Sequence, residues 1–172
     1  MKSEAELGAW FAGRVPENWF TEAPKVVVDR EEIGVLGTLP PLSVVDGLPA
    51  PERAAAVQGY VERFREETRE RRIDIAREAE HRFRRKVSWG VVVDGATVMF
   101  TTLSVPVMTR LRQPERQVLD TLVAAGVARS RSDALAWCVR LVGEHTDTWL
   151  ADLRDALRHV DRIRAEGPGG LD

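Results

Sequence analysis

The stretch "KVSWGVVVDGATVMFTTL", residues 86–103, decides the fold of the first hundred residues. Asp94 and Gly95 form a two-residue turn of the kind that tolerates positive φ at both centres, so they predict a β-hairpin. Pairing outward from the turn sets these residues opposite each other on one face: Val93 with Ala96, Val91 with Val98, and Trp89 with Phe100. That face is apolar and the other is only half apolar, as in a sheet with one packed face and one wetter face.

Upstream, "KVVVDREEIGVLGTL" predicts a second hairpin, with strands over about residues 25–28 and 33–39. Residues 40–51, rich in proline and glycine, predict a loop. From Pro51 to Lys86 the apolar spacing predicts one long helix whose other faces carry alternating Arg and Glu. We therefore expect an α+β fold, in which a small antiparallel sheet packs against a long helix.

The first two dozen residues form an aromatic arm with little periodicity. Its rings stand between glycine and proline residues: Trp10, Phe11, Trp19 and Phe20. We expect the arm to fold by docking on something else, which makes it a candidate surface for a protein partner.

Composition limits the class of protein. The 172 residues are 44% apolar and 30% charged, which suits one globular unit or two small ones. A formal charge of −2 argues against coating nucleic acid through bulk positive charge, so any polyanion site must be a local patch. The single cysteine, Cys138, excludes an internal disulfide framework and fits a reducing compartment. No stretch approaches the roughly 20 apolar residues that span a bilayer, so we expect a cytoplasmic protein without membrane contact.

After the hairpin the sequence predicts a strand followed by two helices. Alternation over residues 105–112 predicts a short strand, and Pro114 opens a helix that ends at Gly126. Ser130 or Ser132 caps a second helix, which is expected to bury these residues: Ala134, Leu135, Cys138, Val139 and one of Leu141 and Val142. A further amphipathic helix follows Val142. The expected domains are residues 1–103, residues 104–166, and a flexible tail over residues 167–172.

Leu111, followed by Leu119 and Leu122 and then "GVARSRSDAL" at residues 126–135, resembles the ribbon-helix-helix family of DNA-binding proteins over roughly residues 104–142. In that family two chains pair their strands into a ribbon that enters the major groove, while the second helix of each chain points its N-terminus at a phosphate. The resemblance implies a homodimer on double-stranded DNA. The implied base contacts are Met108, Arg110 and Arg112, and the implied phosphate contacts are Ser130, Arg131 and Ser132.

Three alternatives concern these basic and hydroxyl residues. Ser130 and Ser132 would need no ligand if they only cap an ordinary helix. The basic turn "RFRRK" either complements a helix C-terminus or supplies additional phosphate contacts from Arg82, Arg84, Arg85 and Lys86. Binding of RNA or single strands by this turn is the weakest alternative, because Phe83 is the one aromatic residue within it and no series of base-stacking aromatics is interleaved with the basic residues.

The sequence lacks the patterns expected of an enzyme. His81, His145 and His159 lie on separate stretches without a second ligand at metal spacing, and no glycine-rich phosphate loop occurs. We expect no catalysis, no metal and no cofactor. The leading hypothesis is a dimeric bacterial DNA-binding protein that regulates transcription. The alternative is a protein-interaction module in which the ribbon-helix-helix element serves dimerisation only.

Overall fold

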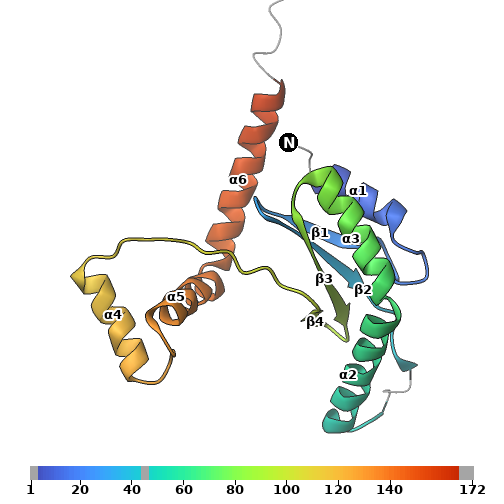
Figure 1. Ribbon diagram of the computed structural model, residues 1–172, viewed down its shortest axis with the longest axis horizontal. Helices are drawn as coiled ribbons and strands as arrows, with labels where there is room; N and C mark the ends of the chain where they lie inside the picture. The colour runs from blue at the N-terminus through green and yellow to red at the C-terminus, as the bar shows by residue number, and fades with distance from the viewer. Residues whose placement is uncertain (1–3, 44–46, 167–172) are drawn as a thin grey trace, which may run out of the picture. The chain divides into compact units, whose positions relative to one another are not determined.

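The computed structural model describes residues 4–43 and 47–166, so the expected C-terminal tail lies outside the described residues. The chain divides into two compact units, Met1–Pro106 and Val107–Asp172, which we call the N-terminal and C-terminal units. Figure 1 labels the helices and strands of both units.

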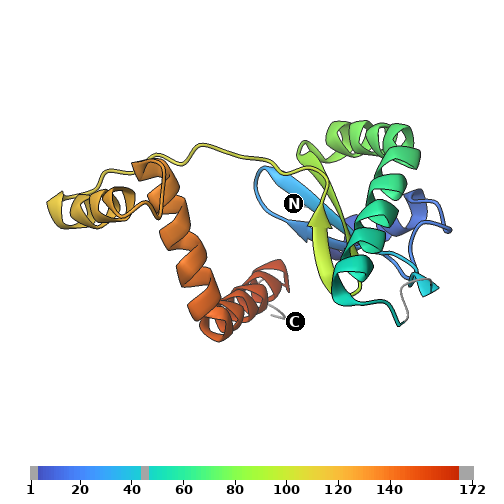
Figure 2. The ribbon, with the colours of Figure 1, turned by 90° about the horizontal axis from the view of Figure 1, so that it is seen from below.

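The N-terminal unit is a four-stranded sheet with helices. Its described elements are, in chain order, α1 (Glu4–Arg14), β1 (Lys25–Val28), β2 (Glu32–Thr38), α2 (Ala50–Glu67), α3 (Arg69–Phe83), β3 (Lys86–Val93) and β4 (Ala96–Met99). The strand order is β1-β2-β3-β4. The predicted α+β class is confirmed, but the expectation of an antiparallel sheet is wrong at its centre, where β2 and β3 pair in parallel. A parallel pair needs a crossover connection, and α2 with α3 provides it (Figures 1 and 2).

Both predicted hairpins form. In the β3–β4 hairpin Val91 pairs with Val98 and Val93 with Ala96, as the sequence predicted. Both turn residues, at positions 94 and 95, have left-handed backbones, with φ of 51° and 77°. In the β1–β2 hairpin the carboxylate of Asp29 accepts the backbone N–H groups of Glu31 and Glu32 at 2.9 and 2.7 Å. Local turn chemistry therefore fixes the register of each hairpin.

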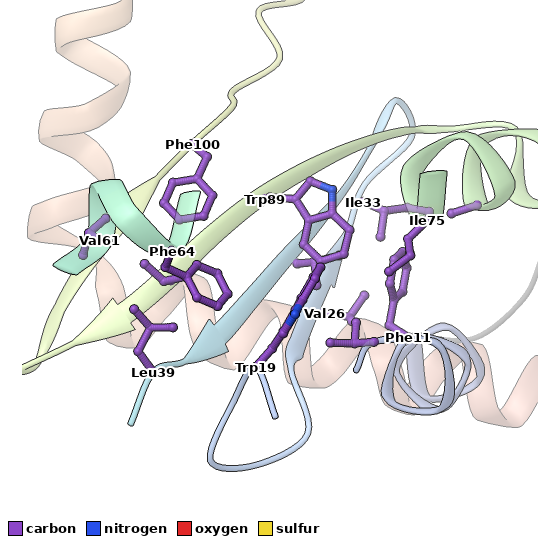
Figure 3. Packing of buried hydrophobic residues seen from close by; sticks show 14 of the residues in the cluster. Phe11, Trp19, Val26, Ile33, Leu39, Val61, Phe64, Ile75, Trp89 and Phe100 are labelled. Carbon is purple, nitrogen blue, oxygen red and sulfur yellow. The ribbon is translucent and has the colours of Figure 1, made fainter. Parts of the chain in front are cut away.

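The core lies between one face of the sheet and the three helices (Figure 3). The sheet supplies Val26, Ile33, Val35, Trp89, Val91 and Val93, and the helices supply Leu7, Phe11, Val61, Phe64, Ile75 and Ala79. Aromatic rings meet edge to face across it, with centroids 6.0 Å apart for Phe11 and Trp89 and 5.8 Å apart for Trp19 and Phe64. Such edge-to-face pairs stabilise a core by more than the burial of their apolar area alone would.

The aromatic arm is part of the core of its own unit. Residues 4–14 form α1, and Phe11 is fully buried. Trp19 is 8% exposed, and the ring of Trp10 meets that of Phe83 at 5.2 Å. The arm therefore docks, as expected, on the rest of its own unit, and its use as a partner surface stays a prediction.

The predicted single helix over residues 51–86 is also wrong, because the chain bends at Thr68 between α2 and α3 and enters β3 at Lys86. The Thr68 hydroxyl donates to the Phe64 carbonyl at 2.6 Å, a backbone contact of the kind that bends helices. Arg72 Nε donates to the same hydroxyl oxygen at 3.0 Å, and Arg72 Nη2 donates to the Arg65 carbonyl at 2.7 Å. The guanidinium therefore ties the two helices together.

Arg72 is only 6% exposed, and its guanidinium lies 4.8 Å from the centroid of the Phe100 ring. Burial, with Arg65 and Arg69 nearby, lowers the pKa of this guanidinium below its ordinary value. The Phe100 ring face and the carbonyls at the end of α2 offset that cost, because both present partial negative charge to the cation.

The C-terminal unit contains α4 (Gln113–Ala124), α5 (Arg131–His145) and α6 (Asp147–Glu166). The strand expected over residues 105–112 does not form, and residues 101–112 carry no regular secondary structure. A strand needs a pairing partner, the described chain offers none to this segment, and Pro106 lacks an N–H to donate. The two predicted helices and the amphipathic helix after them are confirmed.

The core of the C-terminal unit is small. Its buried residues are Leu119, Ala128 and Ala134, with Leu111, Leu122, Val123, Leu135 and Cys138 partly buried against them. Gly126 ends the α4 turn with a φ of 74°. Val139, which the sequence placed in the core, is 66% exposed.

Among the described residues no helix is both long and apolar enough to cross a membrane.

We expect Arg72→Ala to lower the free energy of unfolding by about 2–4 kcal/mol, because it removes two hydrogen bonds from a charged donor, one to the buried Thr68 hydroxyl oxygen and one to the Arg65 carbonyl. Urea unfolding followed by tryptophan fluorescence measures this. Arg71→Ala, at an exposed neighbouring position, is the control and should stay within about 0.5 kcal/mol of the parent. Equal stability of the two variants would mean that the bend holds without the guanidinium.

Candidate nucleic-acid interface

A hollow of about 600 Å³ lies within the C-terminal unit between the segment before α4 and the start of α5. Its lining residues are Val107, Met108, Thr109, Arg110, Leu111, Arg116, Leu119, Arg131, Ser132 and Leu135. Three of these residues carry a guanidinium, and none carries a carboxylate. We call this feature the arginine hollow. Its lining suits an anion with several acceptor oxygens.

The arginine hollow brings together four of the six residues that the sequence assigned to DNA: Met108, Arg110, Arg131 and Ser132. Arg112 and Ser130 do not line it. Met108 is 96% exposed and Arg110 is exposed, so the segment before α4, residues 107–112, which we call the extended segment, presents both side chains to solvent. Residues far apart in the sequence therefore meet on one surface.

Sequence reasoning missed Arg116. It lies in the first turns of α4, and its Nη1 donates to the Leu111 carbonyl at 2.7 Å, which holds the end of the extended segment against the helix. The available signal was the concentration of basic residues around Pro114, with Arg110, Arg112 and Arg116 within seven positions.

Arg131 is held in place by Asp120 of α4. Its Nε and Nη2 donate to the two carboxylate oxygens at 2.6 and 2.7 Å, the bidentate geometry typical of this pair. The bonds from Arg131, with a smaller effect of Arg116, lower the pKa of the Asp120 carboxyl below its usual range. The ion pair joins α4 to α5 and orients Arg131, while it also offsets part of the positive charge of the hollow.

Ser130 is the N-cap of α5, which confirms the prediction that one of the two serines caps this helix. Its hydroxyl oxygen accepts the Asp133 N–H at 3.2 Å, and the Asp133 carboxylate accepts the Arg129 N–H at 2.9 Å. This reciprocal arrangement resembles a capping box. The Ser130 hydroxyl is thus engaged in local structure, and Asp133 brings a negative charge to the helix start.

In the basic turn at the end of α3, residues 82–86, several side chains form local contacts. Arg84 has a left-handed φ of 59° at the helix C-cap, and Lys86 Nζ lies 2.8 Å from a Glu80 carboxylate oxygen. A hollow of about 470 Å³ beside this turn is lined by four basic residues, Arg30, Arg84, Arg85 and Lys86, and by two acidic ones, Glu31 and Glu80. Arg82 lies over the Phe83 ring at 5.7 Å. Its two carboxylates offset part of the positive charge of this hollow, whereas the lining of the arginine hollow includes no carboxylate.

A third hollow, of about 570 Å³, lies in the N-terminal unit between α2 and β4. Its lining is mainly apolar and includes Val57, Val61, Val98, Met99 and Phe100, while the ion pair of Arg53 and Asp94 also lines it. Such a surface suits an apolar group rather than a polyanion. Within the described residues no three His, Cys, Asp or Glu side chains gather as they would around a metal ion.

The fold and its hollows define a two-unit α+β protein, with a sheet unit in the first two thirds and a small helical unit that carries a basic surface. Residues 5–99 match the family model described as Rv1265-like protein, N-terminal domain, and residues 112–164 match the Mb1296 C-terminal domain. The chain belongs to the Rv1265-like family.

Two relatives from mycobacteria support this assignment. The uncharacterized protein Mb1296 of Mycobacterium bovis and the uncharacterized protein Rv1265 of Mycobacterium tuberculosis are each 64% identical to the chain over 159 residues, which cover 92% of this chain and 69% of the relative. No solved structure matches the chain.

The resemblance to the ribbon-helix-helix family is wrong. The C-terminal match is to the Mb1296 C-terminal domain, which runs through α6 to residue 164, and no ribbon-helix-helix family matches. The spacing of Leu111, Leu119 and Leu122 reflects ordinary packing of α4, and of the residue shortly before it, in the small core of this unit. A capped helix after a glycine turn is common to many helical hairpins and does not identify this family.

We expect Ser130→Ala to destabilise the start of α5 by about 1 kcal/mol, because the Asp133 N–H loses its acceptor. Hydrogen exchange of the Asp133 amide should become faster. Ser132→Ala is the matched control, since Ser132 caps nothing in the structure and its loss should leave that exchange rate unchanged. Similar exchange rates in both variants would show that the hydroxyl does not cap the helix.

We expect Arg131→Ala to raise the pKa of Asp120 towards the ordinary aspartate value, because the two charged hydrogen bonds that favour its ionised form are lost. A folded-state pKa below the unfolded value means that the pair stabilises the α4–α5 contact above the unfolded pKa, and that this contribution is lost as pH falls through the folded pKa. A ¹³C carboxyl titration measures the shift. Arg129→Ala, which removes the partner of Asp133 instead, should leave the Asp120 titration unchanged.

Proposed function

We propose that the protein binds double-stranded DNA through the arginine hollow of its C-terminal unit and acts as a regulator of transcription. The observation that carries this proposal is the meeting of Arg110, Arg116 and Arg131 in one hollow whose lining contains no carboxylate. A surface of this kind concentrates positive potential locally, although the whole chain has a formal charge of −2.

The three guanidiniums are suited to different parts of the contact. Arg131 is fixed by Asp120 and presents a positioned edge, while Arg116 is anchored at the Leu111 carbonyl. Fixed side chains lose little conformational entropy when they bind a phosphate. The hydroxyl of Ser132, on the same lining, supplies a further donor to phosphate oxygen.

Arg110 is the residue best suited to read bases. It lies on the extended segment, it is exposed, and it forms no ion pair among the described residues. A single extended stretch of chain is narrow enough to enter the major groove. There a bidentate contact from its guanidinium to guanine contributes about 1–3 kcal/mol of discrimination between bases. Met108, beside it, supplies an apolar surface for a thymine methyl group.

Anisotropy of a fluorescein-labelled duplex, titrated with the full chain over a series of salt concentrations, tests the proposal. We expect binding that weakens steeply with salt, because each neutralised phosphate contributes about −0.9 to the slope of log K against log salt. Arg116→Ala should weaken binding to all duplexes and reduce the magnitude of the slope by about 1. Arg110→Ala should in addition reduce the preference between duplexes of different sequence.

The matched control is Arg140→Ala, which removes an exposed guanidinium of α5 that does not line the arginine hollow. It should change affinity and slope much less than Arg116→Ala. Absence of binding at low salt, or equal losses in the Arg116 and Arg140 variants, would contradict a site at the arginine hollow.

A further inference from the structure

Helix α6 carries an apolar stripe that is uncovered within the C-terminal unit. The stripe residues are spaced by one, three or four positions and lie on one face of the helix: Trp149, Leu150, Leu153, Leu157, Val160 and Ile163. Five of them are between 40% and 63% exposed, and none of the 20 residues of α6 is buried. We call this surface the α6 stripe.

An uncovered stripe of this length is not expected in a stable protein. Most helical stability comes from packing of the apolar face rather than from intrinsic propensity. Contiguous apolar patches on soluble proteins mark interaction surfaces. The C-terminal unit also has few buried residues of its own, and α5 exposes Val139 and Val142 as well. Small units with such cores commonly gain stability by oligomerisation.

We propose that the α6 stripe binds the α6 stripe of a second copy of the chain, with the two helices antiparallel. Symmetric pairing of identical surfaces is the commonest form of oligomer. It would bury both stripes at once, as the apolar seams of antiparallel bundles do.

The charges of α6 select this occupant and this direction. The first half of the helix carries three carboxylates and one guanidinium: Asp147, Asp152, Asp155 and Arg154. The second half carries three guanidiniums and two carboxylates: Arg158, Arg162, Arg164, Asp161 and Glu166. An antiparallel copy sets the acidic half of each helix beside the basic half of the other, whereas a parallel copy sets like beside like. The helix dipoles favour the same direction.

The same charges argue against a membrane as the occupant. Amphipathic helices that lie on anionic lipid carry Lys and Arg on the polar face. The polar side of α6 instead includes Asp152 and Asp155, which an anionic surface repels. The opposite charges of the two halves of α6 also favour a second copy over an unrelated protein, because an apolar groove on another protein would not require them.

Sedimentation equilibrium of the full chain without DNA tests the association. We expect a dimer, and we expect Leu157→Asp to raise its dissociation constant by about 100-fold, because a carboxylate would be buried at the centre of the stripe. Ala151→Asp is the matched control: it adds the same charge to the opposite side of α6, and its dimer should dissociate no more than about threefold more readily. A parent chain that stays monomeric, or equal effects of the two variants, would overturn the proposal.

Cysteine cross-linking tests the direction and does not depend on the stability of the aspartate variant. In a Cys138→Ser background, Leu153→Cys and Val160→Cys are made separately and then mixed. With the stripes fully overlapped and antiparallel, position 153 of one copy lies opposite position 160 of the other, so the mixture should form a heterodimeric disulfide. Each variant alone should form little, since equivalent positions lie about 10 Å apart along the axis, beyond the reach of a disulfide.

Efficient cross-linking of each variant alone would indicate parallel helices and overturn the proposed direction, and no cross-linking in any combination would overturn the interface. These measurements contain no DNA, and the arginine variants leave α6 intact. Failure of this inference is therefore distinguishable from failure of the proposed function, on which it does not rest.

Discussion

Parallel pairing of β2 with β3 is the constraint on which the N-terminal unit depends. The two strands are in register from Glu32 opposite Lys86 to Thr38 opposite Val92. The chain that leaves the end of β2 must therefore return along the sheet before β3 begins. Helices α2 and α3 make this return, and their residues on either side of the bend, Phe64 and Ile75, reach the same core. The bend at position 68 is what lets one connection cover the sheet with both helices.

The C-terminal unit depends on local contacts more than on a buried core. It buries few side chains, and its shape depends on local devices: the serine cap of α5, the left-handed Gly126 and the bidentate pair of Arg131 with Asp120. Because this core is small, many side chains of the unit stay on its surface. Guanidiniums gather in the arginine hollow and apolar side chains line α6. A unit whose groups face outward in this way is suited to binding.

Prediction from the sequence succeeded where the residue type by itself determines the local backbone conformation or hydrogen bond. Asp94 and Gly95 adopt positive φ because few residues other than glycine and aspartate do so readily, and Ser130 caps α5 because a serine hydroxyl satisfies an orphan N–H. Prediction from the sequence failed where the structure of a segment depends on residues far away along the chain. Alternation over residues 105–112 resembles a strand, yet a strand exists only with a partner. The helix bend was missed because the threonine and arginine that make it fit an unbroken helical pattern equally well.

The candidate site divides in the same way. From the sequence alone one obtains the basic and hydroxyl residues near α5, together with the amphipathic character of α6, since both follow from residue type and spacing. Only the tertiary structure decides that Arg116 joins Arg110 and Arg131 in one hollow while Arg112 and Ser130 do not, because that depends on how α4 packs against α5. The parallel centre of the sheet was likewise invisible in the sequence. Strand direction is set by how the connecting helices cross the sheet, and no single stretch of residues records it.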